Sequence, residues 1–233
     1  MEEIVFVAPL YNEAGNLEAF CDEWLPVVRG RGQLLLVDDG STDGSAALAD
    51  ALARRYPEIS VLHKANGGHG SAILMGYRLA LDRDPHWIFQ VDSDRQFDPG
   101  DFERLWSLRN QADFIVGVRA LRQDHWVRIT LSAVHRKLLR WLFGATLGDP
   151  NAPYRLMRAA MVRELLARVP DGTFAPNVLL SLEFARNRKR MIAVPVAHRQ
   201  RPAGQVSIRG WKTLLIGLRC FRELWRYRRR GQG

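Results

Sequence analysis

Two acidic side chains, Asp92 and Asp94, are spaced so that they could share a divalent cation. Residues two positions apart in an extended segment point to the same side, so the two carboxylates would repel each other without a cation. Hard divalent cations prefer oxygen ligands and often bridge one or two carboxylates to a diphosphate. The pair therefore predicts a metal site that binds a diphosphate, and a solvated acidic turn is the alternative.

Polar residues also follow two earlier apolar runs, in the segments Tyr11–Glu13 and Asp38–Ser41. A third segment, Asn66–Gly70, could present backbone N–H groups to a phosphate at the start of a helix. Each segment alone is equally consistent with a turn, because Asp, Asn and Gly are good turn formers. Ligands of open parallel sheets bind beyond the carboxyl ends of the strands, so polar groups at several such ends together predict a binding site.

The elements that would position these groups alternate along the chain. Short apolar runs predict strands over Ile4–Ala8, Leu34–Val37, Ile59–His63, Trp87–Val91, Phe114–Val118 and Ile192–Val196. Helical spacing of apolar residues predicts helices over Asn16–Val28, Ser45–Tyr56, Ser71–Leu81, Pro99–Arg109, Trp126–Phe143, Met157–Arg168, Asn177–Arg186 and Gln205–Tyr227. Strands that alternate with helices of this length predict an α/β fold with a mostly parallel sheet flanked by helices.

The composition of the 233 residues is that of a folded globular protein, with 47% apolar and 25% charged side chains. No apolar run approaches the ~18 residues of a spanning helix, and the chain begins with a strand pattern rather than a signal peptide. Cys21 and Cys220 are expected to be reduced thiols, so we expect a cytoplasmic protein. The dinucleotide fingerprint and the Walker A motif are absent, which removes the usual sequence support for a dehydrogenase or an NTPase.

The net charge of +9 is unevenly distributed along the chain. Residues 1–117 carry 19 acidic and 10 basic side chains, whereas residues 118–233 carry 6 acidic and 24 basic ones. The first part is therefore acidic and the second strongly basic. A protein that coats nucleic acid would be expected to be basic throughout, so we expect no nucleic-acid partner and infer that the two parts do different jobs.

Four segments, taken in order, resemble the signatures of family 2 inverting glycosyltransferases. These segments are Val7–Glu13, Val37–Asp43, Lys64–Ala72 and Asp92–Pro99. Shorter segments resemble the polyprenyl-phosphate branch of that family, the branch of enzymes similar to dolichyl-phosphate mannose synthase. They are Gly117–Arg119, Asp149–Leu156 and Arg201–Gly204 followed by Ser207, although Asn151–Pro153 departs from the usual pattern of the branch. The resemblance covers about residues 4–210.

The resemblance implies a GT-A, Rossmann-like fold, a UDP- or GDP-linked sugar donor and Mg²⁺ or Mn²⁺ as cofactor. Tyr11 and Glu13 would line the nucleoside pocket, and Asp38 would bond the base or ribose. Asp92 and Asp94 would hold the donor diphosphate through the metal, with Asp94 the more direct ligand. The full donor-binding set that the resemblance implies is Pro9, Tyr11, Glu13, Asp38, Asp39, Lys64, Gly70, Asp92, Ser93 and Gln96.

The acceptor is expected to be a polyprenyl phosphate. A hydroxyl acceptor normally needs a general base. We find neither the Glu-Asp pair of the family's non-processive, hydroxyl-directed members nor the Gln-x-x-Arg-Trp motif of its processive synthases. A phosphate monoester has a second pKa of ~6 and is already anionic at neutral pH, so it needs cations instead. The resemblance implies Arg119, Arg122, Arg128 and Arg201 as candidate phosphate ligands, at positions where the polyprenyl-phosphate branch carries phosphate-binding arginines. Arg119 and Arg201 match that branch best and join Asp92 and Asp94 in the expected catalytic set.

Two regions are expected. Residues 1–204 would form the catalytic domain, with a donor half (1–117) and an acceptor half (118–204), and residues 205–233 would form a basic amphipathic helix. Such helices can lie in a membrane interface, where anionic lipid adds ~1 kcal/mol per nearby Lys or Arg. We therefore expect a peripheral protein on the cytoplasmic face of the membrane, with an integral membrane protein as a further candidate partner. The alternative is that the helix packs on the core.

Two other functions are compatible with the sequence. The first is transfer to a hydroxyl of a soluble sugar, a protein or a small molecule, with Glu183 or Asp149 as the base. The second is a non-catalytic basic adaptor built on a transferase scaffold. The intact Asp92 and Asp94 argue against that adaptor.

Overall fold

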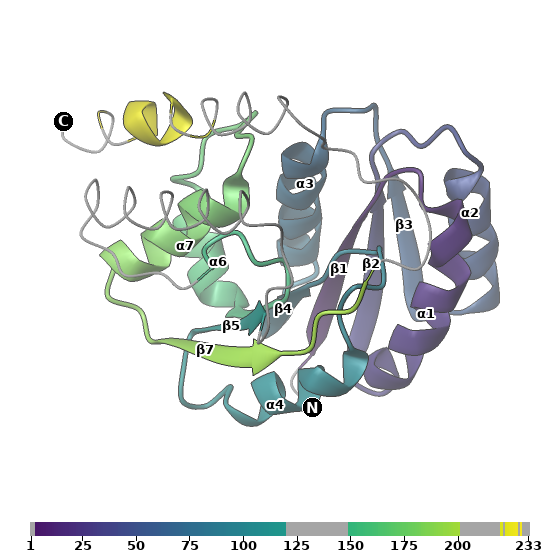
Figure 1. Ribbon diagram of the computed structural model, residues 1–233, viewed down its shortest axis with the longest axis horizontal. Helices are drawn as coiled ribbons and strands as arrows, with labels where there is room; N and C mark the ends of the chain where they lie inside the picture. The colour runs from purple at the N-terminus through teal and green to yellow at the C-terminus, as the bar shows by residue number, and fades with distance from the viewer. Residues whose placement is uncertain (1–2, 120–148, 201–219, 221, 228, 230–233) are drawn as a thin grey trace.

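A computed structural model describes residues 3–119, 149–200, 220, 222–227 and 229. Its centre is a seven-stranded sheet in the order β3-β2-β1-β4-β6-β5-β7 (Figure 1). The strands are β1 (Ile4–Leu10), β2 (Gly32–Asp38), β3 (Ile59–His63), β4 (Trp87–Gln90), β5 (Phe114–Arg119), β6 (Arg155–Arg158) and β7 (Met191–Val196). Of these strands only β6 is antiparallel to its neighbours, β4 and β5. The predicted α/β fold with a mostly parallel sheet is confirmed.

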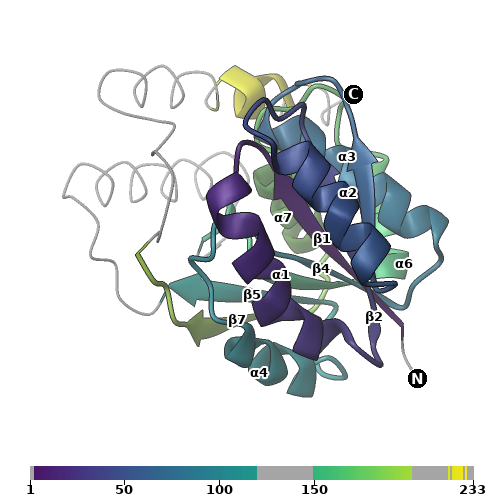
Figure 2. The ribbon, with the colours of Figure 1, turned by 90° about the vertical axis from the view of Figure 1, so that its right-hand side faces the viewer.

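Helices cover both faces of the sheet. They are α1 (Ala14–Val28), α2 (Ser45–Arg55), α3 (His69–Asp82), the 3-10 turn η1 (Pro99–Asp101), α4 (Phe102–Ser107), α6 (Ala159–Leu166) and α7 (Pro176–Arg186). Alternate residues of a strand face opposite sides, so Val5 belongs to the core layer that includes residues of α3, α6 and α7, and Phe6 to the layer that includes residues of α1, α2 and α4. Figure 2 shows α1 and α2 side by side on the second face. The two helix layers cover the faces of the sheet, and the polar residues that follow β1, β2 and β4 lie at the carboxyl ends of these strands.

One predicted helix begins later than expected. The helix predicted over Met157–Arg168 is α6, which starts at Ala159, and the residues before it form strand β6. Leu156 and Met157 enter opposite core layers, which is the alternation of a strand rather than the spacing of a helix. The helix predicted over Trp126–Phe143 lies outside the described residues.

The described part of the C-terminal segment packs on the core. Residues 222–227 are helical, and the side chains of Leu224 and Tyr227 are buried in the apolar layer of α3, α6 and α7. The Glu223 carboxylate accepts hydrogen bonds from the backbone N–H groups of Phe174 (2.7 Å) and Ala175 (3.2 Å) at the start of α7. Cys220 is helical as well, and residues 205–219 and 221 of the predicted helix lie outside the described residues. Within the described residues, no helix combines the length and apolar character needed to span a bilayer.

Candidate active site at the carboxyl ends of the central strands

The carboxyl ends of β1, β2 and β4 bring the predicted donor-binding segments together. The backbone N–H of Asp39 donates to the Leu10 carbonyl oxygen over 2.9 Å, which joins the ends of β2 and β1. The Ser93 hydroxyl donates to the Pro9 carbonyl oxygen over 2.8 Å, which joins the segment after β4 to β1. Ser93, predicted as a donor ligand, is buried, so in this structure it holds the two strand ends together.

The loops after β1 and β2 are tied together by side chains that bond to backbone. Asn12 accepts from the N–H of Thr42 (2.8 Å) through its side chain and donates its own N–H to the Ser41 hydroxyl (3.0 Å). The N–H of Glu13 donates to the Ser45 hydroxyl over 2.8 Å. Asn12 has a φ of 54°, a left-handed conformation that Asn tolerates better than most residues. These hydrogen bonds therefore join the two loops, and the exposed Tyr11 lies in the first of them.

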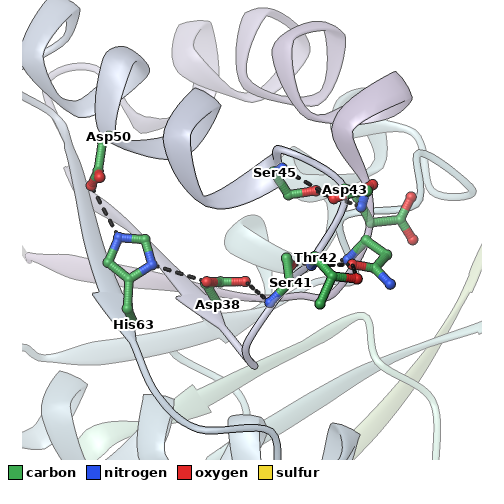
Figure 3. Close-up of polar contacts among 9 residues, drawn as sticks. Asp38, Ser41, Thr42, Asp43, Ser45, Asp50 and His63 are labelled. Atoms are coloured by element: carbon green, nitrogen blue, oxygen red, sulfur yellow. Dashed lines mark hydrogen bonds and ion pairs between the residues drawn. The ribbon is translucent and has the colours of Figure 1, made fainter.

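Asp38 lies at the end of β2 (Figure 3). The residue is almost closed to solvent. One of its oxygens accepts the Ser41 N–H over 3.0 Å, and the other lies 2.9 Å from Nδ1 of His63. The second ring nitrogen of His63, Nε2, lies 3.0 Å from a carboxylate oxygen of Asp50 on α2. The hydrogen bonds to Asp38 and then to Asp50 raise the pKa of His63 above its ordinary value. Nothing in the sequence pointed to His63 as part of the site, because its contacts with Asp38 and Asp50 are visible only in the fold.

Asp39 holds the glycine-rich loop before α3. Its carboxylate accepts from the ammonium of Lys64 and from the backbone N–H groups of Gly67 (2.9 Å) and Gly68 (2.7 Å). Gly68 has a φ of 86°, which a residue with a side chain rarely adopts. Asp39 and Lys64, both predicted to contact the donor, thus shape the loop at the start of α3. Direct donor contact by either remains a prediction.

Gly70 lets the second half of the chain approach the site. A Cβ atom at this position would lie 2.6 Å from the carbonyl oxygens of both Thr173 and Phe174. Only glycine therefore fits where the first turn of α3 meets the segment before α7. Gly70 is buried by that contact, so the structure gives it a packing role.

Asp92 and Asp94 follow β4 beside the loop of β1. Oδ1 of Asp92 is buried and accepts no hydrogen bond, and Nε2 of His69 lies 3.8 Å from it. Asp94 accepts from the N–H of Gln96 over 3.2 Å, which turns the chain after the second carboxylate. Among the residues described, no three His, Cys, Asp or Glu side chains converge as a complete metal site. A buried carboxylate oxygen without a donor fits a cation that takes its other ligands from a diphosphate.

Arg155, on β6, is a buried cation that sequence reasoning did not single out. Its guanidinium donates to the carbonyl oxygens of Pro150 (3.0 Å), Ala152 (2.8 Å) and Asn177 (3.2 Å). Burial lowers the pKa of this group, and the charge of Asp92 acts in the opposite direction. Arg155 therefore fixes the loop at 150–152 behind the two aspartates. The only sequence signal was its place within the Asp149–Leu156 segment.

Of the four arginines predicted to bind the acceptor phosphate, the structure describes one. Arg119 is the half-buried last residue of β5, while Arg122, Arg128 and Arg201 lie outside the described residues. The segment that leads to Arg201 packs against the turn after Asp94: the N–H of Arg199 donates to the Gln96 carbonyl over 2.7 Å, and Gln96 Nε2 donates to the Arg199 carbonyl over 3.3 Å. Gln96, predicted to bind the donor, therefore links the two halves of the chain.

Glu183, the candidate base for a hydroxyl acceptor, lies on α7 among basic partners. Its carboxylate is buried and pairs with Arg168 (3.2 Å) and Arg186 (3.3 Å), and Asn187 also donates to it. These contacts satisfy both oxygens and give Glu183 a structural role. The geometry therefore does not favour Glu183 as a base.

Comparison with protein families finds a match to the model described as "Glycosyl transferase family 2" over residues 5–166. An undecaprenyl-phosphate mannosyltransferase from Micrococcus luteus is 29% identical over 89% of this chain and 88% of its own. A polyprenol monophosphomannose synthase from Mycolicibacterium smegmatis is 28% identical over 90% of this chain and 82% of its own.

Two solved structures share the fold at 18% identity, each over 97% of this chain. Glucosyl-3-phosphoglycerate synthase from Mycobacterium tuberculosis, solved with Mn²⁺, UDP and phosphoglyceric acid, has a TM-score of 0.72 over 78% of its length. A mannosyltransferase from Pyrobaculum calidifontis, solved with GDP-Man and Mn²⁺, has a TM-score of 0.65 over 62% of its length. The expected GT-A-like fold is confirmed.

Proposed function

Because the chain belongs to glycosyl transferase family 2, we propose that it moves one sugar from a UDP- or GDP-linked donor to a polyprenyl phosphate. The observation that carries this proposal is the position of Asp92 and Asp94 beside the joined loops of β1 and β2, with a buried Asp92 oxygen that accepts no hydrogen bond. Both curated relatives are named for sugar transfer to polyprenyl carriers, and each aligns with about nine-tenths of the chain.

The donor would bind at the carboxyl ends of the central strands. Asp92 and Asp94 would hold Mg²⁺ or Mn²⁺, and the two structures with bound Mn²⁺ support a divalent metal. Such a cation neutralises charge that develops on the departing diphosphate. Tyr11 and Glu13 would line the nucleoside pocket, and Asp38 would hold the loop after β2 that forms part of it.

The acceptor would approach from the basic half of the chain. Arg119, with Arg122, Arg128 and Arg201, would bring an anionic phosphate towards the anionic donor. A phosphate acceptor needs no general base, and the ion pairs of Glu183 with Arg168 and Arg186 support this choice over a hydroxyl acceptor.

We also propose that the protein works as a peripheral protein on the cytoplasmic face of the membrane. The acceptor is a lipid, and residues 205–233 carry a large share of the basic side chains. These basic side chains would attract anionic lipid, and an integral membrane protein is a further candidate to bind residues 205–233. The burial of Leu224 and Tyr227 means that part of this helix also serves the core.

Product analysis of the acceptor tests this proposal. A thermal-shift panel of UDP- and GDP-sugars with Mn²⁺ first selects the donor, because a ligand that binds the native state stabilises it. The purified protein is then given that donor with a short-chain prenyl phosphate, the matching prenyl alcohol or free sugars. We expect product only with the phosphate. Product with the alcohol or with free sugars instead would establish the hydroxyl-acceptor function and contradict the proposal.

A further inference from the structure

Asp38, His63 and Asp50 form a continuous chain of polar contacts from the sheet to α2 (Figure 3). Strands β2 and β3 pair in parallel with Asp38 opposite His63, so the register itself places the ring beside the carboxylate. Asp50 then faces the other side of the ring from α2, at 3.0 Å. The histidine is therefore held between two carboxylates that come from two different elements.

Both nitrogens of the His63 ring face a carboxylate oxygen. A neutral imidazole has one N–H, so it would leave one of the two carboxylates facing a ring lone pair. The protonated ring donates to both, and those two bonds raise the pKa of His63. Asp38 and Asp50 are the two charged groups that the structure places against the ring. The geometry therefore fits the imidazolium form.

The contact between His63 and Asp38 reaches both loops of the donor site. The second oxygen of Asp38 accepts the Ser41 N–H, and the Ser41 hydroxyl accepts the Asn12 N–H. The Asn12 side chain in turn accepts from Thr42. Loss of the ring would leave a buried carboxylate oxygen without a donor, which favours rearrangement of this loop.

We propose that His63, oriented by Asp50, is a positioning residue of the donor pocket, which keeps the loops after β1 and β2 in the shape that accepts the donor nucleotide. This inference rests on the proposed function, because it assumes that these loops bind a nucleotide. It assigns His63 no contact with the donor. A lost ring should therefore raise the KM for the donor and leave kcat for bound donor nearly unchanged.

The same arrangement fixes the direction of the pH dependence. As the pH rises through the pKa of His63 the ring loses its proton, one carboxylate loses its donor, and nucleotide affinity should fall. Stability follows the same sign: the pKa is raised in the folded state, so the contribution is complete below about 6.5, the ordinary value, and is lost as the pH rises through the raised one.

Three variants distinguish a positioning role of His63 in the donor pocket from a general structural role. His63→Gln can donate to only one carboxylate at a time. Asp50→Asn keeps an oxygen for the ring but removes a negative charge, so it should lower the pKa of His63. His86→Gln is the matched control, because His86 precedes β4 at the opposite end of the strand from the site, and its exposed ring accepts the backbone N–H of Glu3 over 3.3 Å.

Calorimetry of UDP and of GDP with Mn²⁺, between pH 6 and pH 9, tests the proposal. We expect His63→Gln to weaken nucleotide binding by about five- to ten-fold at low pH, the size of one typical net hydrogen bond. At pH 6, Asp50→Asn should bind nucleotide as tightly as the wild-type chain. As the pH rises, its affinity should fall at a lower pH than the affinity of the wild-type chain. His86→Gln should follow the wild-type curve. The phosphate groups of the nucleotide titrate in the same way with every variant, so differences between the pH profiles of the variants report the protonation of the His63 ring.

Each result decides between the two proposals. Wild-type affinity and pH profile in His63→Gln would overturn this inference and leave the proposed function intact. Should His63→Gln fail to fold, Asp50→Asn decides, because an unshifted pH profile in that variant overturns the inference. A wild-type chain that binds neither nucleotide with Mn²⁺ would overturn the proposed function, and this inference with it.

Discussion

The hydroxyl of Ser93 donates to the carbonyl oxygen of Pro9 over 2.8 Å, and the serine is 3% exposed. Ser93 lies between Asp92 and Asp94, so this bond sets where both carboxylates stand relative to the end of β1. It explains why a small hydroxyl residue separates the two acids. In this structure Ser93 holds the strand ends, where the sequence had suggested a ligand for the donor.

Replacing Ser93 with Ala should lower both stability and activity. The Pro9 carbonyl oxygen would lose a buried donor, which costs about 1–3 kcal/mol. Urea unfolding measures the stability, and the KM for the donor shows whether the aspartates have moved. Ser107→Ala is the control, because Ser107 ends α4 with an exposed bond to the Arg104 carbonyl and should change stability by less than about 0.5 kcal/mol.

Replacing Gly70 with Ala should destabilise the contact between α3 and the segment before α7. The new Cβ would lie 2.6 Å from two backbone carbonyl oxygens, and overpacking of this kind costs about 1–3 kcal/mol. Gly100→Ala provides the comparison, because its Cβ would meet only the Asp98 side chain, at 3.3 Å. Equal melting temperatures of the two variants would show that the close approach at Gly70 is absent.

Arg155 should tolerate neither Met nor Lys. Removing its buried guanidinium takes a donor from the carbonyl oxygens of Pro150, Ala152 and Asn177, at a cost of about 1–3 kcal/mol for each buried oxygen left unsatisfied. Lysine lacks the fork of donors and should restore little of the loss. Denaturant unfolding of both variants measures this. A fully stable Arg155→Lys would mean that the charge, rather than the geometry, matters at this position.

The sheet was predictable from the sequence because each parallel strand is a short apolar run followed by a polar turn. Strand β6 was not, because its four residues run without a break into α6 and their apolar side chains suit either element. Leu156 and Met157 show their strand character only through the opposite core layers they enter. The position and direction of an antiparallel strand between β4 and β5 depend on which strands it pairs with, and the periodicity of the sequence does not reveal that pairing.

The site was predictable to a different extent. The spacing of Asp92 and Asp94 and their place after an apolar run were enough to predict where they lie. The roles of Asp39 and His63 were not predictable, because their partners lie on other elements. Asp39 bonds to Lys64 and Gly67, which follow it by 25 and 28 residues, and His63 bonds to Asp50 on α2. Sequence reasoning found the polar residues at the strand ends more readily than the contacts that hold the loops together.

Sugar transfer to a short-chain polyprenyl phosphate by Asp94→Ala, beside the wild-type chain, tests the central claim most directly. With Mn²⁺ and the selected donor, we predict turnover by the wild-type protein that EDTA abolishes. The variant should lose transfer by at least about a hundred-fold. Its urea unfolding curve should stay close to that of the wild-type protein. Near wild-type turnover by a folded Asp94→Ala, or wild-type transfer that EDTA leaves unchanged, would contradict the assignment of metal-dependent glycosyl transfer to this site.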